Sequence, residues 1–187
     1  MEKFRAFIAV SIPTDVCRRL AEIEKQLSAS GADVKWVAEG NFHVTMKFLG
    51  DVDSNRIEEL TEAICSAVQD MPPFEVALSG VGAFPNTRQP NVVWVGTSTG
   101  GDELKAIVER LDSSLECLGF AKEAKPFSPH ITVGRTKTPR NFGQLREAIE
   151  RLNDIQAGSF LVEEVALMKS DLRPSGQVYT KIAGCEL

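Results

Sequence analysis

Residues 41–50 read Asn-Phe-His-Val-Thr-Met-Lys-Phe-Leu-Gly, a run that favours a β-strand and ends at a glycine. Successive side chains along a strand point to opposite faces of the sheet. We therefore expect His43, Thr45 and Lys47 to share a polar face, while the apolar residues between and after them pack into a core. The polar face must then look onto water or onto a cleft.

The same pattern occurs a second time, and the two copies use both histidines of the chain. In the second copy His130 and Thr132 share one strand face, with apolar neighbours on the other. Two polar faces of matching composition can line one cleft from both sides. The two His-x-Thr-x motifs are His43-Val44-Thr45-Met46 and His130-Ile131-Thr132-Val133.

Apolar residues recur at helical spacing in four segments, and strand-like runs lie between them. Each helix is expected to begin at a residue whose side-chain oxygen can cap free backbone N–H groups. These residues are Thr14, Asp53, Asp102 and Asn141. Strands are predicted at residues 4–10, 34–37, 43–49, 74–84, 92–97, 130–135, 160–170 and 177–183. This interleaving predicts an α+β or α/β fold, and the repeated motif indicates two pseudo-equivalent lobes that face each other.

The composition is that of a globular chain: 187 residues, 43% hydrophobic and 25% charged, which suits a single domain over residues 1–187. No apolar run approaches the roughly 20 residues of a membrane span, and the first residues lack the features of a signal peptide. The cysteines are scattered and form no metal-binding or disulfide-like pattern. They are Cys17, Cys65, Cys117 and Cys185. We therefore expect reduced thiols in a cytoplasmic protein.

The chemistry of the paired motifs suits phosphodiester hydrolysis. A neutral imidazole can take a proton from water while a protonated one gives a proton to the leaving oxygen, and an unperturbed pKa of about 6.5 lets both forms exist near neutrality. The hydroxyls of Thr45 and Thr132 can donate hydrogen bonds to phosphate oxygens, and Lys47 can add positive charge. The net charge of −5 argues against a protein that coats nucleic acid along its length, but one RNA end presents only one or two phosphates.

Other kinds of catalytic site find little support in the sequence. A zinc site needs three or four closely spaced ligands, which two distant histidines and scattered cysteines do not supply, so we expect neither a metal nor a cofactor. No G-x-S-x-G elbow is present. Gly100 and Gly101 form a turn before a helix and are not followed by the G-K-[ST] of a phosphate-binding loop.

The sequence resembles the 2H phosphoesterase superfamily, and specifically the LigT-like RNA 2′,3′-cyclic phosphodiesterases, also called 2′-5′ RNA ligases. The resemblance spans nearly the whole chain, and its two motif blocks are highly specific. It rests on residues 4–9, on Trp36-Val37 with residues 41–50, on residues 82–85 with 93–96, and on residues 126–135. It implies an α+β fold of two antiparallel-sheet lobes with helices outside and a central cleft.

The resemblance also implies residue roles. His43 would donate a proton to the departing 3′-oxygen, His130 would activate water, and Thr45 and Thr132 would hold the phosphate. The sequence alone cannot order the two histidines, because the motifs are nearly symmetric. The implied reaction opens a cyclic phosphate to a 2′-phosphate, and 2′-5′ ligation is the same path in reverse.

Several flanking residues are candidates for binding substrate. Arg135 is a phosphate or RNA contact by resemblance, although strict alternation places it opposite His130 unless a bulge at Gly134 turns it toward the cleft. Aromatic rings can stack on a base, but core packing is the competing interpretation for each. The candidate rings are Phe42, Phe127 and Tyr179. A basic patch near the second motif, which solvation alone also explains, would comprise Lys122, Lys125, Lys137 and Arg140.

Three alternatives stay open at this point. The same chemistry can act on a small cyclic nucleotide, the fold can serve as a nucleotide- or RNA-binding module without turnover, or the chain can be an interaction scaffold. The paired motifs favour an enzyme, because a binder does not need two matched proton-transfer groups. The expected partners are RNA ends with a 2′,3′-cyclic phosphate, which tRNA can supply, with a monomer as the default state.

Overall fold

The computed structural model describes residues 2–174 and 176–187, which form four α-helices, nine β-strands and two short 3₁₀ helices. In chain order these elements are β1 (Lys3–Ser11), α1 (Thr14–Ser28), β2 (Val34–Trp36), η1 (Glu39–Asn41), β3 (His43–Asp53), η2 (Ser54–Arg56), α2 (Ile57–Val68), β4 (Phe74–Phe84), β5 (Val92–Thr99), α3 (Gly101–Glu116), β6 (His130–Thr136), α4 (Phe142–Arg151), β7 (Gln156–Val162), β8 (Glu164–Arg173) and β9 (Gly176–Glu186).

All the described strands join one sheet in the order β7-β4-β5-β6-β3-β1-β8-β9, with β2 paired to β6, and the pairings are antiparallel. The sheet divides into a lobe around β6 and a lobe around β3. Between the two lobes, β3 and β6 pair at a single position, Val44 with Ile131. The predicted α+β fold with two antiparallel lobes is therefore confirmed.

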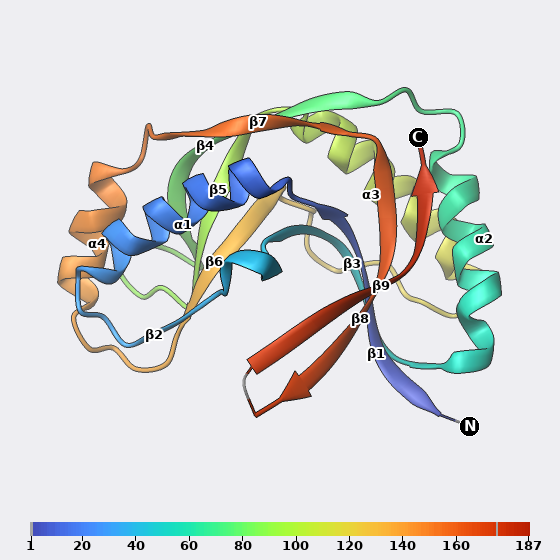
Figure 1. Ribbon diagram of the computed structural model, residues 1–187, viewed down its shortest axis with the longest axis horizontal. Helices are drawn as coiled ribbons and strands as arrows, with labels where there is room; N and C mark the ends of the chain where they lie inside the picture. Colours follow the sequence, from blue (N-terminus) through green and yellow to red (C-terminus); the bar gives the residue numbers. More distant parts are fainter. Residues whose placement is uncertain (1, 175) are drawn as a thin grey trace.

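Helices cover the outer faces of both lobes, and two of them cross over to do so (Figure 1). Helix α1 follows β1 of the His43 lobe but packs on β7, β6 and α4 of the other lobe. Helix α3 follows β5 of the His130 lobe but packs chiefly on α2 and β3. The lobes thus exchange helices, and neither consists of one continuous stretch of chain.

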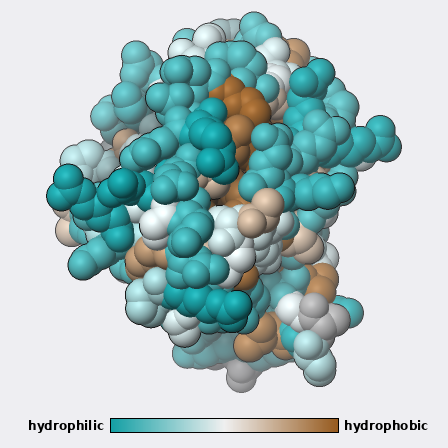
Figure 2. All heavy atoms as spheres, turned by 90° about the vertical axis from the view of Figure 1, so that its left-hand side faces the viewer, coloured by the Kyte–Doolittle hydropathy of each residue, from teal (hydrophilic) through white to brown (hydrophobic). Residues whose placement is uncertain are grey.

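The predicted apolar stripes account for this packing. Helix α1 buries Val16, Leu20, Ile23 and Leu27, the residues that its helical spacing places on one side. Burying each such side chain contributes about 1.5–3 kcal/mol to stability. Figure 2 views the end of the molecule that carries α4 and shows hydrophilic side chains around a narrow apolar strip, as expected where the apolar faces of the helices turn inward.

Two local predictions are wrong. The single strand expected at residues 160–170 is two strands, β7 and β8, separated at Glu163. In the described part of the chain, no side chain caps any of the four helices. Thr14 begins α1 after Pro13, and Asn141 instead adopts a left-handed conformation and donates its Nδ2 to the carbonyl oxygen of Gly31 at 3.0 Å. Asn141 therefore fastens the start of α4 to the turn after α1.

The expectation of four reduced thiols is also wrong. Cys65 on α2 and Cys185 on β9 form a disulfide across a sequence separation of 120 residues. Cys17 is a buried free thiol and Cys117 an exposed one. No local spacing could reveal the bond, because α2 and β9 meet only once the sheet has formed. The disulfide fastens the last strand to the helix that covers its lobe.

Candidate active site

The two histidine strands lie side by side where the lobes meet. Val44 and Ile131 pair there and are both fully buried on the core side. Since side chains alternate along each strand, the histidines and threonines of both motifs emerge on the opposite side. One face of the β3–β6 junction therefore carries His43, Thr45, His130 and Thr132.

Each imidazole is held by the same backbone contact. The Nδ1 atom of His43 lies 2.8 Å from the carbonyl oxygen of Asn41, and that of His130 lies 2.7 Å from the carbonyl oxygen of Ser128. A carbonyl oxygen only accepts, so Nδ1 must donate a proton in both rings. In the neutral tautomer Nε2 is then unprotonated and can accept a proton. Both rings thus use Nδ1 for anchoring and leave Nε2 for chemistry.

Aromatic side chains fix the plane of each imidazole. Tyr179 packs edge-on against His43 at 5.1 Å and 86°, and Phe84 packs edge-on against His130 at 5.1 Å and 85°. A second ring lies beside the first in each lobe: Phe7 is 4.9 Å from His43 and 5.0 Å from Tyr179, and Trp94 is 6.4 Å from His130 and 5.1 Å from Phe84. Each histidine thus has two aromatic neighbours, so the two lobes match in these neighbours as well as in the motif.

The surroundings favour the neutral form of both rings. Burial lowers the pKa of His43, with a smaller lowering from the charges of Arg135 and His130, while the hydrogen bond to Asn41 acts in the opposite sense. Burial likewise lowers the pKa of His130, and Arg135 lowers it further, against the hydrogen bond to Ser128. The charge of His130 also disfavours a charge on His43, as the smallest of these effects.

A cavity of about 460 Å³ opens beside His43, within the size range of small-ligand sites. It brings together His43, Thr45, Thr132, Arg135 and Tyr179. The rest of its described wall comprises Arg5, Ala6, Phe7, Lys35, Trp36, Val37, Ala38, Asn41, Phe48, Ser170, Gly176 and Gln177. His130 is not part of the described wall, although Thr132, two residues further along β6, is.

A bulge follows the threonine of each motif and reverses the alternation. On β3, Ile8 pairs with Lys47 and Ala9 with Thr45, so Met46 has no partner in β1. On β6, Val93 pairs with Gly134 and Trp94 with Thr132, which leaves Val133 without a partner in β5. One extra residue sends the next side chain inward and the one after it outward. The side chains five positions after the histidines, Phe48 on β3 and Arg135 on β6, therefore face the cleft.

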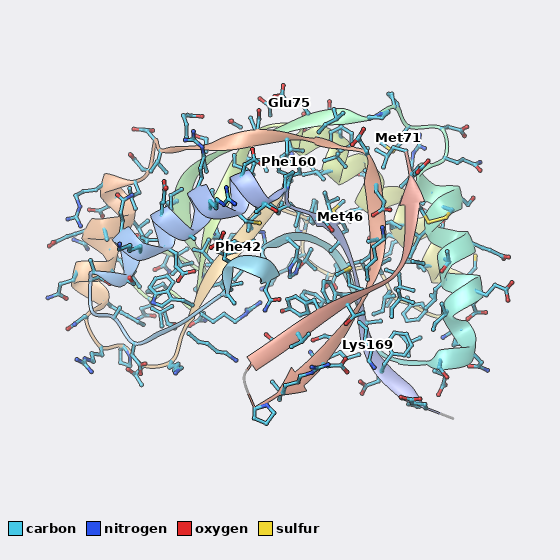
Figure 3. All side chains as sticks on the ribbon, in the orientation of Figure 1. Phe42, Met46, Met71, Glu75, Phe160 and Lys169 are labelled. Atoms are coloured by element: carbon cyan, nitrogen blue, oxygen red, sulfur yellow. A yellow bond between two sulfur atoms is a disulfide. The ribbon has the colours of Figure 1, made fainter. Side chains whose placement is uncertain are left out.

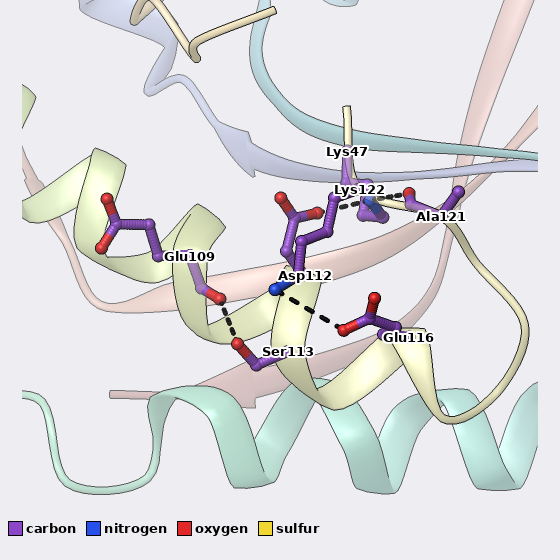
Figure 4. A network of polar contacts seen from close by, with 7 residues as sticks. All are labelled: Lys47, Glu109, Asp112, Ser113, Glu116, Ala121 and Lys122. Carbon is purple, nitrogen blue, oxygen red and sulfur yellow. Dashed lines mark hydrogen bonds and ion pairs between the residues drawn. The ribbon is translucent and has the colours of Figure 1, made fainter. Parts of the chain in front are cut away.

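Lys47 is buried by this reversal, and its prediction as a substrate contact is wrong. It is only 2% exposed. Its Nζ lies 2.5 Å from an Asp112 carboxylate oxygen on α3 and donates to the carbonyl oxygen of Ala121 at 2.8 Å (Figure 4). The bulge at Met46 turns Lys47 away from the cleft and into an ion pair that fastens β3 to α3 and to the segment after it.

Arg135 faces the cleft because of the same reversal in the other lobe. It lines the cavity, as the resemblance implies and strict alternation does not. The bulge is at Val133, not at Gly134 as expected. Gly134 is required for packing: a Cβ there would lie 2.6 Å from Cγ1 of Val34 and 2.7 Å from Cε3 of Trp36.

The three candidate aromatic residues have different positions. Tyr179 lines the cavity. Phe42 is 4% exposed and belongs to the core, so it cannot stack on a base (Figure 3). Phe127 is half-buried against the core and lies outside the described wall of the cavity. The ring that the sequence interpretation missed is Phe48, which is 57% exposed and lines the cavity. Aligning the two motifs would have found it, because Phe48 matches Arg135.

The predicted basic patch does not line the cavity. Lys122 lies 3.5 Å from a carboxylate oxygen of Glu116 (Figure 4), and Lys125, Lys137 and Arg140 are exposed away from the described cavity wall. Within residues 2–174 and 176–187, no group of three or more His, Cys, Asp or Glu side chains could hold a metal ion. None of the helices that the structure describes is both long and apolar enough to span a bilayer.

Known proteins are similar to this chain in sequence and in fold. An RNA 2′,3′-cyclic phosphodiesterase of Methanothermobacter thermautotrophicus is 36% identical over 95% of this chain and 96% of its own. The crystal structure of the Thermus thermophilus protein TT0787 superposes with a TM-score of 0.81 at 27% identity, covering 98% of this chain and 97% of that one. Escherichia coli LigT complexed with NADP+ gives a TM-score of 0.77 at 25% identity, covering 100% and 99%.

A curled antiparallel sheet with two anchored imidazoles at its centre defines a two-histidine phosphoesterase. The sequence model of the 2′-5′ RNA ligase superfamily matches residues 12–174. The chain belongs to that superfamily and is a phosphodiesterase of the LigT-like type.

Proposed function

We propose that this protein hydrolyses the 2′,3′-cyclic phosphodiester at RNA ends to a 2′-phosphomonoester, by acid–base catalysis that needs no metal. The observation that supports this most strongly is the matched pair of imidazoles. Each ring donates Nδ1–H to a carbonyl oxygen and keeps Nε2 for proton transfer. The relatives at about a third identity are RNA 2′,3′-cyclic phosphodiesterases.

The proposed reaction moves one proton in and one proton out. Nε2 of His130 takes a proton from water as the water oxygen bonds to phosphorus. The bond from phosphorus to the 3′-oxygen breaks, and the protonated Nε2 of His43 gives its proton to that oxygen. The products are a 2′-phosphate and a 3′-hydroxyl, and solvent returns the proton from His130 to His43. Thr45 and Thr132 donate hydrogen bonds to the non-bridging oxygens, where charge builds up.

The substrate contacts follow from the cavity wall. Arg135 supplies positive charge for a phosphate, and its exposed guanidinium can bind two oxygens at once. Tyr179 and Phe48 present rings on which a terminal base can stack. With a 5′-hydroxyl of a second RNA in place of water, the same groups would run the reaction as 2′-5′ ligation.

A second candidate is the same hydrolysis on a small cyclic nucleotide. The solved structure of E. coli LigT with NADP+ favours it, because the similar fold of that protein accommodates a dinucleotide. The cavity of about 460 Å³ would also accommodate a single nucleotide. Comparing a mononucleotide with an RNA end of the same terminal base separates the two candidates.

The cellular setting is a proposal separate from the chemistry. We infer a cytoplasmic monomer that acts on RNA ends such as those of cleaved tRNA. The Cys65–Cys185 bond is unusual for a reducing compartment, although intracellular proteins of hyperthermophiles are an exception. Cell fractionation would test the location, and sedimentation the oligomeric state.

The test of the function is a reaction with a defined product. A short RNA that ends in a 2′,3′-cyclic phosphate is incubated with purified protein in excess chelator, and ³¹P NMR locates the phosphate. We expect a 2′-phosphate at an undiminished rate. A 3′-phosphate product would show that the bond from phosphorus to the 2′-oxygen breaks instead. Loss of activity with chelator would exclude the metal-free mechanism.

A sulfur-substituted substrate then orders the two histidines. Sulfur in place of the bridging 3′-oxygen leaves as a thiolate and needs no general acid. His43→Ala should therefore recover most of its activity on this substrate, while His130→Ala should not. The opposite pattern would exchange the two roles.

A further inference from the structure

The described wall of the cavity carries three basic side chains and no acidic one. They are Arg5, Lys35 and Arg135. The chain as a whole has a net charge of −5, so this concentration of positive charge runs against its average. Only one cation is needed beside a single cyclic phosphate. At least two of the three basic side chains are therefore unexplained by the reaction.

Lys35 and Arg135 are forced together by the sheet. They are register partners across β2 and β6, so their side chains rise from the same face at neighbouring positions. Like charges directly opposite each other on a sheet are destabilising. In residues 2–174 and 176–187, neither of them has a carboxylate within 4.0 Å. Such a pair suits a bound anion that neutralises both.

Arg5 faces this pair from the other lobe. It lies on β1, in register with Ser170 on β8, which also lines the cavity. Arg5, Arg135 and Tyr179 line the same cavity, and the charges of both arginines lower the pKa of Tyr179, against a larger raising by burial. Asp51, the partner of Arg5 on β3, lies outside the described cavity wall. Positive charge therefore flanks the cleft on both sides.

We propose that Lys35 and Arg135, with Arg5 across the cleft, form a subsite for the backbone phosphate one nucleotide upstream of the cyclic end. The preferred substrate is then an oligonucleotide end rather than a cyclic mononucleotide. This inference rests on the proposed function, because the upstream phosphate is defined relative to the cyclic phosphate at the histidines. A cation pair of this kind binds through charge and reads no base.

Three substrates of increasing length test the subsite: a cyclic mononucleotide with no upstream phosphate, a dinucleotide with one, and a trinucleotide with two, all with the same terminal base. We expect kcat/KM to rise about tenfold from the first to the second. Lys35→Gln should reduce that ratio by about three- to tenfold, since it removes one of the paired charges. Lys25→Gln, which removes an exposed lysine on α1, is the matched control and should keep the wild-type ratio.

Salt provides a readout that a merely structural role of Lys35 would not move. Binding of a phosphate releases counterions, so kcat/KM on the dinucleotide should fall with salt more steeply than on the mononucleotide. In Lys35→Gln the slope of log kcat/KM against log salt should flatten by about 0.7, the value for one contact to a single strand.

The outcomes distinguish the subsite from the function on which it rests. Equal kcat/KM on mononucleotide and dinucleotide, or an unchanged ratio in Lys35→Gln, overturns the subsite and leaves the cyclic phosphodiesterase in place. No turnover of any of the three substrates by the wild-type protein overturns both. A ratio that falls in the lysine variant and holds in the control supports the subsite.

Discussion

The buried ion pair between Lys47 and Asp112 offers a sharp test of the reversed alternation on β3. The Lys47 side chain is 1% exposed and that of Asp112 is 15% exposed, and the Nζ donates to Ala121 as well. If Lys47 faced the cleft, water would hydrate its ammonium group, and removing Asp112 would change the stability of the protein little. A lysine that is buried keeps its charge only while a partner balances it. The variants Asp112→Ala, Lys47→Met and Lys47→Met/Asp112→Leu separate these cases.

The magnitudes follow from what each variant leaves unpaired. Breaking one side of a buried pair costs about 3–5 kcal/mol, and the partial exposure of Asp112 places Asp112→Ala at the lower end, about 3 kcal/mol. Lys47→Met removes the ammonium and keeps most of the stem, while Asp112 can turn to water, so about 1 kcal/mol is expected. The double variant removes both charges and should lie within about 1 kcal/mol of wild type. The two positions are thus strongly non-additive.

Urea denaturation at neutral pH, with the disulfide intact, measures these free energies of unfolding. The slopes against urea should agree among the variants, so that the midpoints report stability alone. An Asp112→Ala variant within about 0.5 kcal/mol of wild type would refute the buried pair. The double variant should also retain cyclic phosphodiesterase activity, because Lys47 points away from the cleft. Loss of activity in a double variant of normal stability would restore Lys47 as a substrate contact.

Four further outcomes are expected. His43→Ala and His130→Ala should each lower kcat by about 10²–10⁴-fold in initial-rate assays on cyclic RNA, and a near-wild-type rate in either would exclude the acid–base pair. Because burial lowers the pKa of both histidines, a plot of kcat/KM against pH should be bell-shaped, with its centre below pH 6.5. The negative charge of the bound phosphate should move the corresponding profile of kcat to higher pH. A rate that only rises with pH would contradict this. Because the pKa values of both histidines are lower in the folded protein than in the unfolded chain, the unfolded chain binds protons at a higher pH than the folded protein does. The free energy of unfolding should therefore decrease as the pH falls below about 6.5. Cys65→Ser should lower the free energy of unfolding by about 4–5 kcal/mol, because it removes a crosslink to Cys185 across 120 residues. Cys117→Ser, which changes an exposed free thiol, is the control. Equal stability of the two variants in a denaturation experiment would show that the disulfide does not form.

Much of the fold could be predicted because local pattern and tertiary packing agree. The stripe of α1 is apolar at the positions that the other lobe covers, and Val44 and Ile131 are apolar where the histidine strands meet. The polar face of each motif follows from strict alternation over three residues, from histidine to threonine. That is as far as alternation holds.

The rest depended on contacts that no local pattern encodes. Alternation fails after Thr45 because Met46 bulges, so Lys47 and Phe48 exchange the faces that the sequence predicts for them. The bulge forms where β1 and β3 must stay in register although one of them carries an extra residue. The charge balance of the cleft was equally hidden, because Lys35 reaches Arg135 only through the pairing of β2 with β6.

The exchange of α1 and α3 between the lobes limits how this fold can be altered. A fragment that ended after β5 would hold α1 without the β6 and β7 that it covers, and β3 without the α3 that packs on it. This fragment and the remaining one would each expose apolar faces that the other covers in the whole chain. Neither lobe can therefore be transferred to another protein by itself. Segments that line the cleft without carrying a helix of the other lobe can vary without separating the two halves, and the β8–β9 hairpin, which supplies Ser170 and Tyr179 to the cleft and exposes Leu172, is such a segment.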